Sequence, residues 1–143
     1  MKLKTFVLAL GTFAASNVWA QAEKVAHLGS QATVEEGFIA VLKKGYDKAE
    51  GVLGEPRQLA ILQKQTGTTK PVRFKVSTIK TYPNKPNGAV CKRMEVDYYL
   101  ANGMGRDGKV IDFPKPFRVG FQLNLCSDGT APEDNEESVN GNS

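Results

Sequence analysis

The chain contains few residues of the kinds that perform catalysis. It has one histidine, His27, with two cysteines and a single tryptophan among 143 residues. A serine or cysteine nucleophile would need His27 as its base. One histidine with scattered carboxylates does not make a metal site. We therefore expect no enzymatic activity, no metal and no cofactor.

No apolar run is long enough to cross a bilayer. The longest, Thr5–Ala15, follows two lysines and precedes small residues at Val18 and Ala20, a pattern typical of a secretory signal peptide. We expect residues 1–20 to be cleaved, with cleavage after Ala22 as the alternative. The mature chain would then have no membrane span, and the protein would be exported to the periplasm or secreted.

Acidic residues are absent between Glu55 and Glu95, a stretch that holds nine bases. Beyond Cys126 the bias reverses, with five acids and no base. Residues 21–126 keep 17 of the 19 bases and 10 of the 15 acids. Since the last segment has too few apolar side chains to offset its ordering entropy, we predict one domain over 21–126 and a disordered acidic tail over 127–143.

The two cysteines, Cys91 and Cys126, are predicted to form a disulfide. An even pair in an exported chain is oxidised by default, and the spacing does not match a CxxC redox or zinc motif. The chain after the signal has no N-x-S/T glycosylation acceptor, which favours a protein of the bacterial envelope.

An amphipathic helix is predicted over residues 33–52, where apolar side chains recur at helical spacing. Thr33 and Glu36 have the spacing of a capping box. Gly37 and Gly45 weaken the helix, and we expect Gly45 to allow a close approach to the sheet.

The remaining pattern predicts a second helix over about 56–65, followed by strands where the apolar period changes to two. The strands cover about 72–82, 90–101 and 117–126, and residues 83–88 form a turn. The predicted fold is α+β: an N-terminal amphipathic helix, or a helix pair, packed on a three- to four-stranded antiparallel sheet with one cross-strand disulfide.

The cysteines also predict a strand register. If Cys91 faces Cys126 across an antiparallel pair, the core-face pairs are all apolar, whereas a shift by one residue would oppose each to a polar side chain. This register leaves residues 102–116 as a long glycine-rich connection, in which residues 110–113 form either a short strand or part of a plain loop. The predicted pairs are Met94–Leu123, Val96–Phe121, Tyr98–Val119 and Leu100–Phe117.

Three short motifs suggest chemistry that their contexts oppose. Residues 103–108 match GxGxxG, but no helix follows as a dinucleotide site requires. Ser77 begins an SxxK match, but it lies in a predicted strand. Glu95 and Asp97 project from one sheet face about 7 Å apart, a separation that glycoside hydrolysis tolerates, yet neighbouring arginines favour a solvated charge ladder.

A basic surface is the strongest functional signal. We expect a partner-binding face on the side of the sheet away from the helix, with a second candidate in the glycine-rich connection. Aromatic side chains that would stack on bases are few, so nucleic acid is not expected. The face comprises Arg73, Lys75, Arg93, Tyr99 and Arg118, and the loop comprises Arg106, Asp107 and Lys109.

Three functional hypotheses follow. The first is a non-catalytic binding protein for another envelope or secreted protein: either an accessory subunit of an envelope secretion or conjugation machine, or an inhibitor or immunity protein for an envelope-acting enzyme. The second is a binder of an anionic envelope polymer such as lipopolysaccharide. The third is a small hydrolase using Glu95 and Asp97. The sequence leaves the oligomeric state open.

Overall fold

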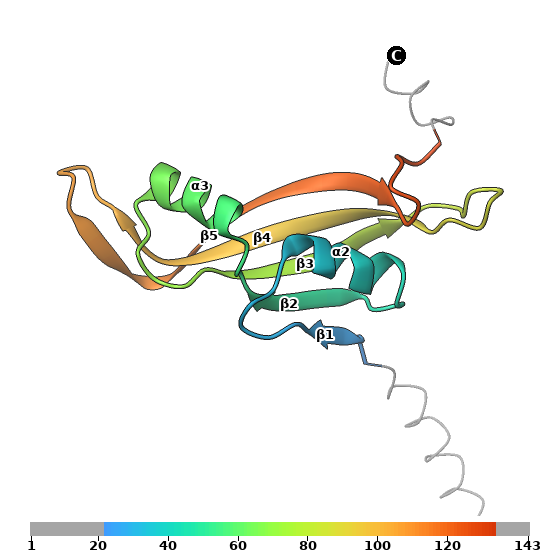
Figure 1. Ribbon diagram of the computed structural model, residues 1–143, viewed down its shortest axis with the longest axis horizontal. Helices are drawn as coiled ribbons and strands as arrows, with labels where there is room; N and C mark the ends of the chain where they lie inside the picture. Colours follow the sequence, from blue (N-terminus) through green and yellow to red (C-terminus); the bar gives the residue numbers. More distant parts are fainter. Residues whose placement is uncertain (1–21, 134–143) are drawn as a thin grey trace, which may run out of the picture.

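The computed structural model describes residues 22–133. The predicted signal peptide, 1–20, and residues 134–143 of the predicted tail lie outside the described residues. Figure 1 shows the elements in order along the chain. They are β1 (Val25–His27), α2 (Val34–Leu42), β2 (Lys48–Val52), α3 (Pro56–Thr66), β3 (Arg73–Thr81), β4 (Cys91–Met104) and β5 (Val110–Cys126).

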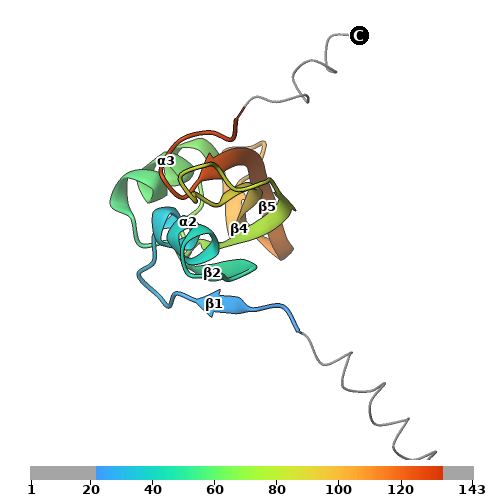
Figure 2. The same ribbon diagram turned by 90° about the vertical axis from the view of Figure 1, so that its right-hand side faces the viewer.

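The described strands form one mixed sheet in the order β1-β2-β3-β4-β5. β1 pairs parallel with β2, and every other pair is antiparallel. The predicted α+β class is confirmed, but the prediction of three or four antiparallel strands is wrong, because β1 and β2 add an edge that sequence periodicity did not indicate. The helices lie on one side of the curved sheet, as the view along the strands shows (Figure 2).

The predicted helix over 33–52 is correct only in its first part. α2 ends at Leu42, and Gly45 takes a left-handed φ of 79° that turns the chain out of the helix. The segment then becomes β2, in which Ala49 is fully buried between Ala26 of β1 and Val76 of β3. Apolar spacing suited both structures, and the small side chain of Ala49 fits the narrow position between two strands.

A different glycine from the one predicted allows α2 to approach the sheet. A Cβ at Gly37 would lie 2.8 Å from Cγ2 of Val76, whereas Gly45 is exposed and has open space around it. The predicted capping box is present: the Glu36 N–H donates to Thr33 Oγ1, and the Thr33 N–H donates to Glu36 Oε1. Gly37 and this cap together set α2 against β3.

The second predicted helix is confirmed as α3. Pro56 occupies its first turn, and Gly67 ends it with a φ of 76°. The segment after α3 is tied to β4 because the buried Asn102 accepts hydrogen bonds from Thr68 Oγ1 and the Thr69 N–H, at 2.8 and 2.9 Å. The C-terminal end of α3 is therefore held near the end of β4 that leads into the turn of the β4–β5 hairpin.

The predicted register between β4 and β5 is confirmed at every predicted pair. Cys91 and Cys126 oppose each other with their Cα atoms 4.0 Å apart, and they form the disulfide. Disulfides form in oxidising compartments, which agrees with the expectation of export. Thus the cysteine pair did identify which side chains of the two strands share a face.

The prediction of a long loop over 102–116 is wrong. The register shifts after Leu100, and Asn102 then pairs with Asp112, so the two strands continue to a short turn at residues 105–109. The extra residues of β5 form an irregular segment over 113–116. The sheet therefore extends into a hairpin that projects from one end of the molecule (Figure 1).

Candidate functional site

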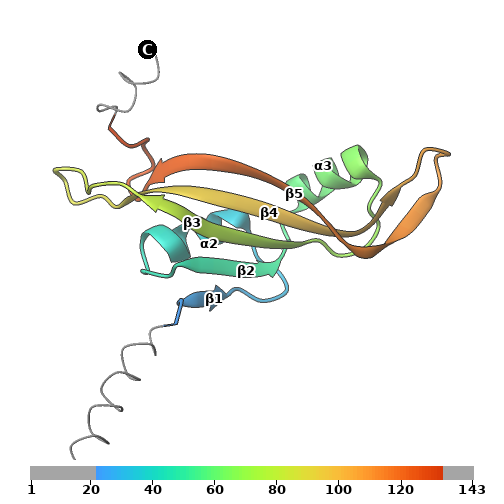
Figure 3. The same cartoon turned by 180° about the vertical axis from the view of Figure 1, so that it is seen from behind.

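Alternate residues of β3, β4 and β5 form a polar face on the side of the sheet away from the helices. Their sequence neighbours, such as Phe74 and Val96, are buried in the core beneath α2, so the intervening side chains point the other way. Figure 3 shows the sheet from this side. Strand pairing aligns them in three rows, Arg73–Tyr99–Arg118, Lys75–Asp97–Gly120 and Ser77–Glu95–Gln122.

The first two rows hold four of the five side chains predicted for this face. The fifth, Arg93, lies six residues from Tyr99 along β4, roughly 20 Å at the rise of a strand. There its Nε donates to Asn124 Oδ1 at 3.0 Å. The same Asn124 oxygen also accepts a hydrogen bond from the Tyr82 hydroxyl at 3.1 Å. Arg93 therefore belongs to the disulfide end of the sheet and not to the main cluster.

A depression of about 310 Å³ lies within the main cluster. It is lined by Arg73, Lys75, Tyr99, Glu50 and Pro116, together with Phe74. Lys75 Nζ lies 5.9 Å from the centroid of the Tyr99 ring, within the range of a cation–π contact. Arg73 is exposed and has no ion pair in the part of the chain that the structure describes. The positive charge of Arg73 is therefore not paired within residues 22–133.

Beside this pocket, Arg118 is held by two carboxyl groups. Its Nη1 lies 3.7 Å from Glu95 Oε1 and 3.6 Å from Asp97 Oδ1. The Asp97 side chain is only 4% exposed, and Gln122 donates to the other Glu95 oxygen at 3.3 Å. Because Arg118 is neutralised in this way, it contributes less free positive charge than the sequence indicated.

The surroundings of Asp97 raise the pKa of its carboxyl group. Burial raises the pKa of Asp97, and the negative charge of Glu95 and a hydrogen bond with it raise this pKa further, against the lowering effect of Arg118. Both carboxyl groups contact the same Arg118 guanidinium, as expected for a charge ladder along the sheet face.

The predicted binding loop is the turn of the β4–β5 hairpin. The Gly105 N–H donates to the Lys109 carbonyl at 2.7 Å, and the Lys109 N–H donates to Asp107 Oδ1 at 3.1 Å. Gly108 takes a φ of 81°. Asp107 thus helps to form the turn, while Arg106 and Lys109 have exposed side chains at the tip of the hairpin.

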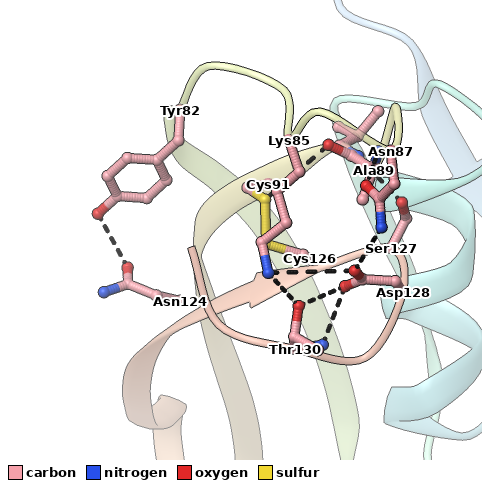
Figure 4. The surroundings of a disulfide bond; sticks show 11 residues. Tyr82, Lys85, Asn87, Ala89, Cys91, Asn124, Cys126, Ser127, Asp128 and Thr130 are labelled. Carbon is pink, nitrogen blue, oxygen red and sulfur yellow. Dashed lines mark hydrogen bonds and ion pairs between the residues drawn. A yellow bond between two sulfur atoms is a disulfide. The ribbon is translucent and has the colours of Figure 1, made fainter. Parts of the chain in front are cut away.

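The opposite end of the sheet is closed by the disulfide and a hydrogen-bonded turn (Figure 4). Asp128 accepts from Thr130 and from Asn87, and these bonds lower the pKa of Asp128 to about 2. Lys85 contacts both Thr130 and Asp128. This turn lies in the segment that sequence analysis assigned to the tail, and it packs the residues after Cys126 against the β3–β4 loop.

The other motifs lie in β1, in β3 and at the turn of the β4–β5 hairpin. His27 lies in β1 with an exposed side chain, and its Nδ1 is 3.1 Å from Glu50 Oε1. Ser77 lies in β3, and residues 103–108 form a strand end and a turn between two strands. As predicted, Ser77 lies in a strand and no helix follows residues 103–108.

One surface was missed by the sequence analysis. The apolar side chains of β5 were expected on the core face, and they do lie on the helix side of the sheet. Yet Phe117 is 57% exposed and Phe121 is 48% exposed. The sequence held no signal for this exposure, because it depends on how far the two helices reach across the assembled sheet.

Neither helix within residues 22–133 is long and apolar enough to cross a membrane. In the same range, no three His, Cys, Asp or Glu side chains are grouped as metal ligands would be. Comparison with protein-family models, curated proteins and solved structures found no match to this chain.

Proposed function

We propose that this protein is a non-catalytic binding module of the bacterial envelope that recognises another envelope or secreted protein. An accessory subunit of an envelope secretion or conjugation machine is the form we favour, with an inhibitor or immunity protein for an envelope-acting enzyme as the alternative form. Its partner would contact the polar face of the sheet and the tip of the β4–β5 hairpin.

The observation that supports this proposal is the cationic pocket on the polar face. Arg73, Lys75 and Tyr99 combine two positive charges with an aromatic ring in one depression. The acid in its lining, Glu50, contacts His27. A guanidinium group binds a carboxylate through paired hydrogen bonds, and the tyrosine ring offers an apolar contact beside it. We therefore infer that the partner presents an acidic side chain, flanked by an apolar group, to this pocket.

The test compares two double charge reversals that change the net charge equally. In Arg73→Glu/Lys75→Glu the pocket is reversed, whereas in Lys43→Glu/Lys44→Glu two exposed lysines after α2 are reversed. Proteins captured from an envelope fraction are identified by mass spectrometry, and binding of the purified partner is then measured by calorimetry. We expect the pocket variant to bind at least about tenfold more weakly, a loss of roughly 1.4 kcal/mol, and the control to bind normally.

Equal binding by both variants would remove the polar face from the proposal. A second candidate is an anionic envelope polymer, which the run of nine bases without an acid favours. Purified lipopolysaccharide is the probe for it. Electrostatic binding of that kind would weaken steeply with salt, so binding that persists in half-molar salt would contradict this candidate.

A further inference from the structure

The outer edge of β5 is unpaired within residues 22–133, since β5 is the last strand of the sheet. In an antiparallel pair, successive residues direct their backbone groups alternately toward and away from the neighbour. The Ser127 N–H donates to the Val90 carbonyl of the β4 side, whereas the Cys126 N–H donates outward to Thr130. The same alternation along β5 leaves the N–H and C=O groups of Arg118, Gly120, Gln122 and Asn124 directed outward.

This edge has defined ends. Pro116 has no N–H to donate, and the Cys126 N–H is already bonded to the Thr130 carbonyl at 2.8 Å. Natural sheets protect their edges with prolines, lysines and irregular pairing, and β5 has all three over residues 113–116 but none over 117–125. The open edge is therefore nine residues long and has Phe121 at its midpoint.

The helix side of this edge is apolar and partly uncovered. Phe117 and Phe121 are about half exposed. Near the end of the strand, a hollow of about 400 Å³ lies between α2 and β5, lined in part by Phe38, Leu42 and Leu125. An aromatic side chain of a further strand placed beside Leu125 would lie next to this hollow.

We propose that a second copy of this chain occupies the edge, with two β5 strands pairing antiparallel about a two-fold axis at Phe121. Four backbone hydrogen-bonded positions on each strand are used, and the two sheets become one. Phe117 of each copy then lies opposite Leu125 of the other, beside the hollow under α2. The resulting pairs are Phe121–Phe121, Val119–Leu123, Phe117–Leu125, Gly120–Gln122 and Arg118–Asn124.

The pattern of residues favours a second copy over an unrelated strand. Apolar side chains stand at 117, 119, 121, 123 and 125, a set that is symmetric about its centre, so the two-fold pairing opposes apolar to apolar throughout. The only charge in the segment, Arg118, faces the neutral Asn124 and not another arginine. Such self-complementarity is what a two-fold interface requires. The proposal does not depend on the polar-face pocket.

The first experiment measures the mass of the mature protein in solution by analytical ultracentrifugation. We expect a dimer, and we expect Phe121→Lys to be monomeric because it opposes two lysines at the axis. Ile79→Lys is the matched control: Ile79 is exposed to the same 48% as Phe121 but lies on β3, so this variant should remain dimeric. Thermal unfolding verifies that both variants are folded. A monomeric wild-type protein at all concentrations, or equal dissociation by the two variants, would overturn the proposal.

The second experiment tests the register by cysteine substitution. At the axis, Phe121 residues face each other at a non-hydrogen-bonded pair, the kind of position that Cys91 and Cys126 occupy within the chain. Phe121→Cys should therefore form a disulfide-linked dimer on non-reducing gels. In Phe117→Cys the two thiols would lie eight residues apart, roughly 26 Å, and should remain unlinked. Linkage through position 117, or through neither position, would contradict the pairing.

Discussion

The carboxyl group of Asp97 fills the space over Gly120, which lies directly opposite it on β5. A Cβ at position 120 would collide with Asp97 Oδ1 and would lie 2.9 Å from the Val96 carbonyl oxygen. The missing side chain of Gly120 thus creates the place in which Asp97 is buried on an otherwise open face.

Gly120→Ala is therefore expected to destabilise the protein. Alanine generally favours an extended strand over glycine by about 0.5–1 kcal/mol, but crowding of a packed site costs about 1–3 kcal/mol, so the clash should dominate. The free energy of unfolding is measured in urea. The loss should shrink when Asp97 is also replaced by alanine, and an equal loss in both backgrounds would place the strain elsewhere.

Asp97 should make stability depend on pH. Its pKa is raised from the ordinary 3.8 in the folded protein, so the folded state binds its proton more tightly than the unfolded state does. The stabilisation is complete below the unfolded pKa and is lost as the pH rises through the raised folded pKa. Asp97→Asn removes this titration, so its stability relative to wild type should increase from pH 3 to pH 7. A difference that stays constant over this range would contradict the prediction.

We expect the disulfide to stabilise the protein mainly by lowering the conformational entropy of the unfolded chain. Cys91 and Cys126 are separated by 35 residues, a loop whose closure the chain-entropy model values at about 4 kcal/mol. We expect Cys91→Ser/Cys126→Ser to lose about this much free energy of unfolding in urea, with the β4–β5 pairing retained at low temperature in circular dichroism. A loss below about 1 kcal/mol would show that the unfolded chain is already compact.

The N-terminal cap of α2 offers a smaller and separate test. Thr33→Ala removes the acceptor of the Glu36 N–H and should lower the free energy of unfolding by about 1 kcal/mol. Thr33→Ser keeps an oxygen at that position and should restore most of the loss. If serine and alanine were equally destabilising, the methyl group of Thr33 and not its hydroxyl would be responsible.

Sequence by itself determined the elements that local rules control. Pro56 and Gly67 mark the ends of α3, and alternation with one pair of cysteines gave the β4–β5 register, since a shift by one residue exchanges the two faces of a strand. Strand alternation also placed Arg73, Lys75 and Tyr99 on one face of the sheet, because successive side chains of a strand point to opposite faces.

Tertiary structure decided the rest. Residues 43–52 have apolar spacing that suits helix or strand, and only the narrow position between β1 and β3 makes Ala49 part of a strand. Periodicity also gives the face on which Phe117 and Phe121 lie without saying whether anything covers it. That depends on how far two short helices reach across five strands, a property of the assembled layers and not of any segment.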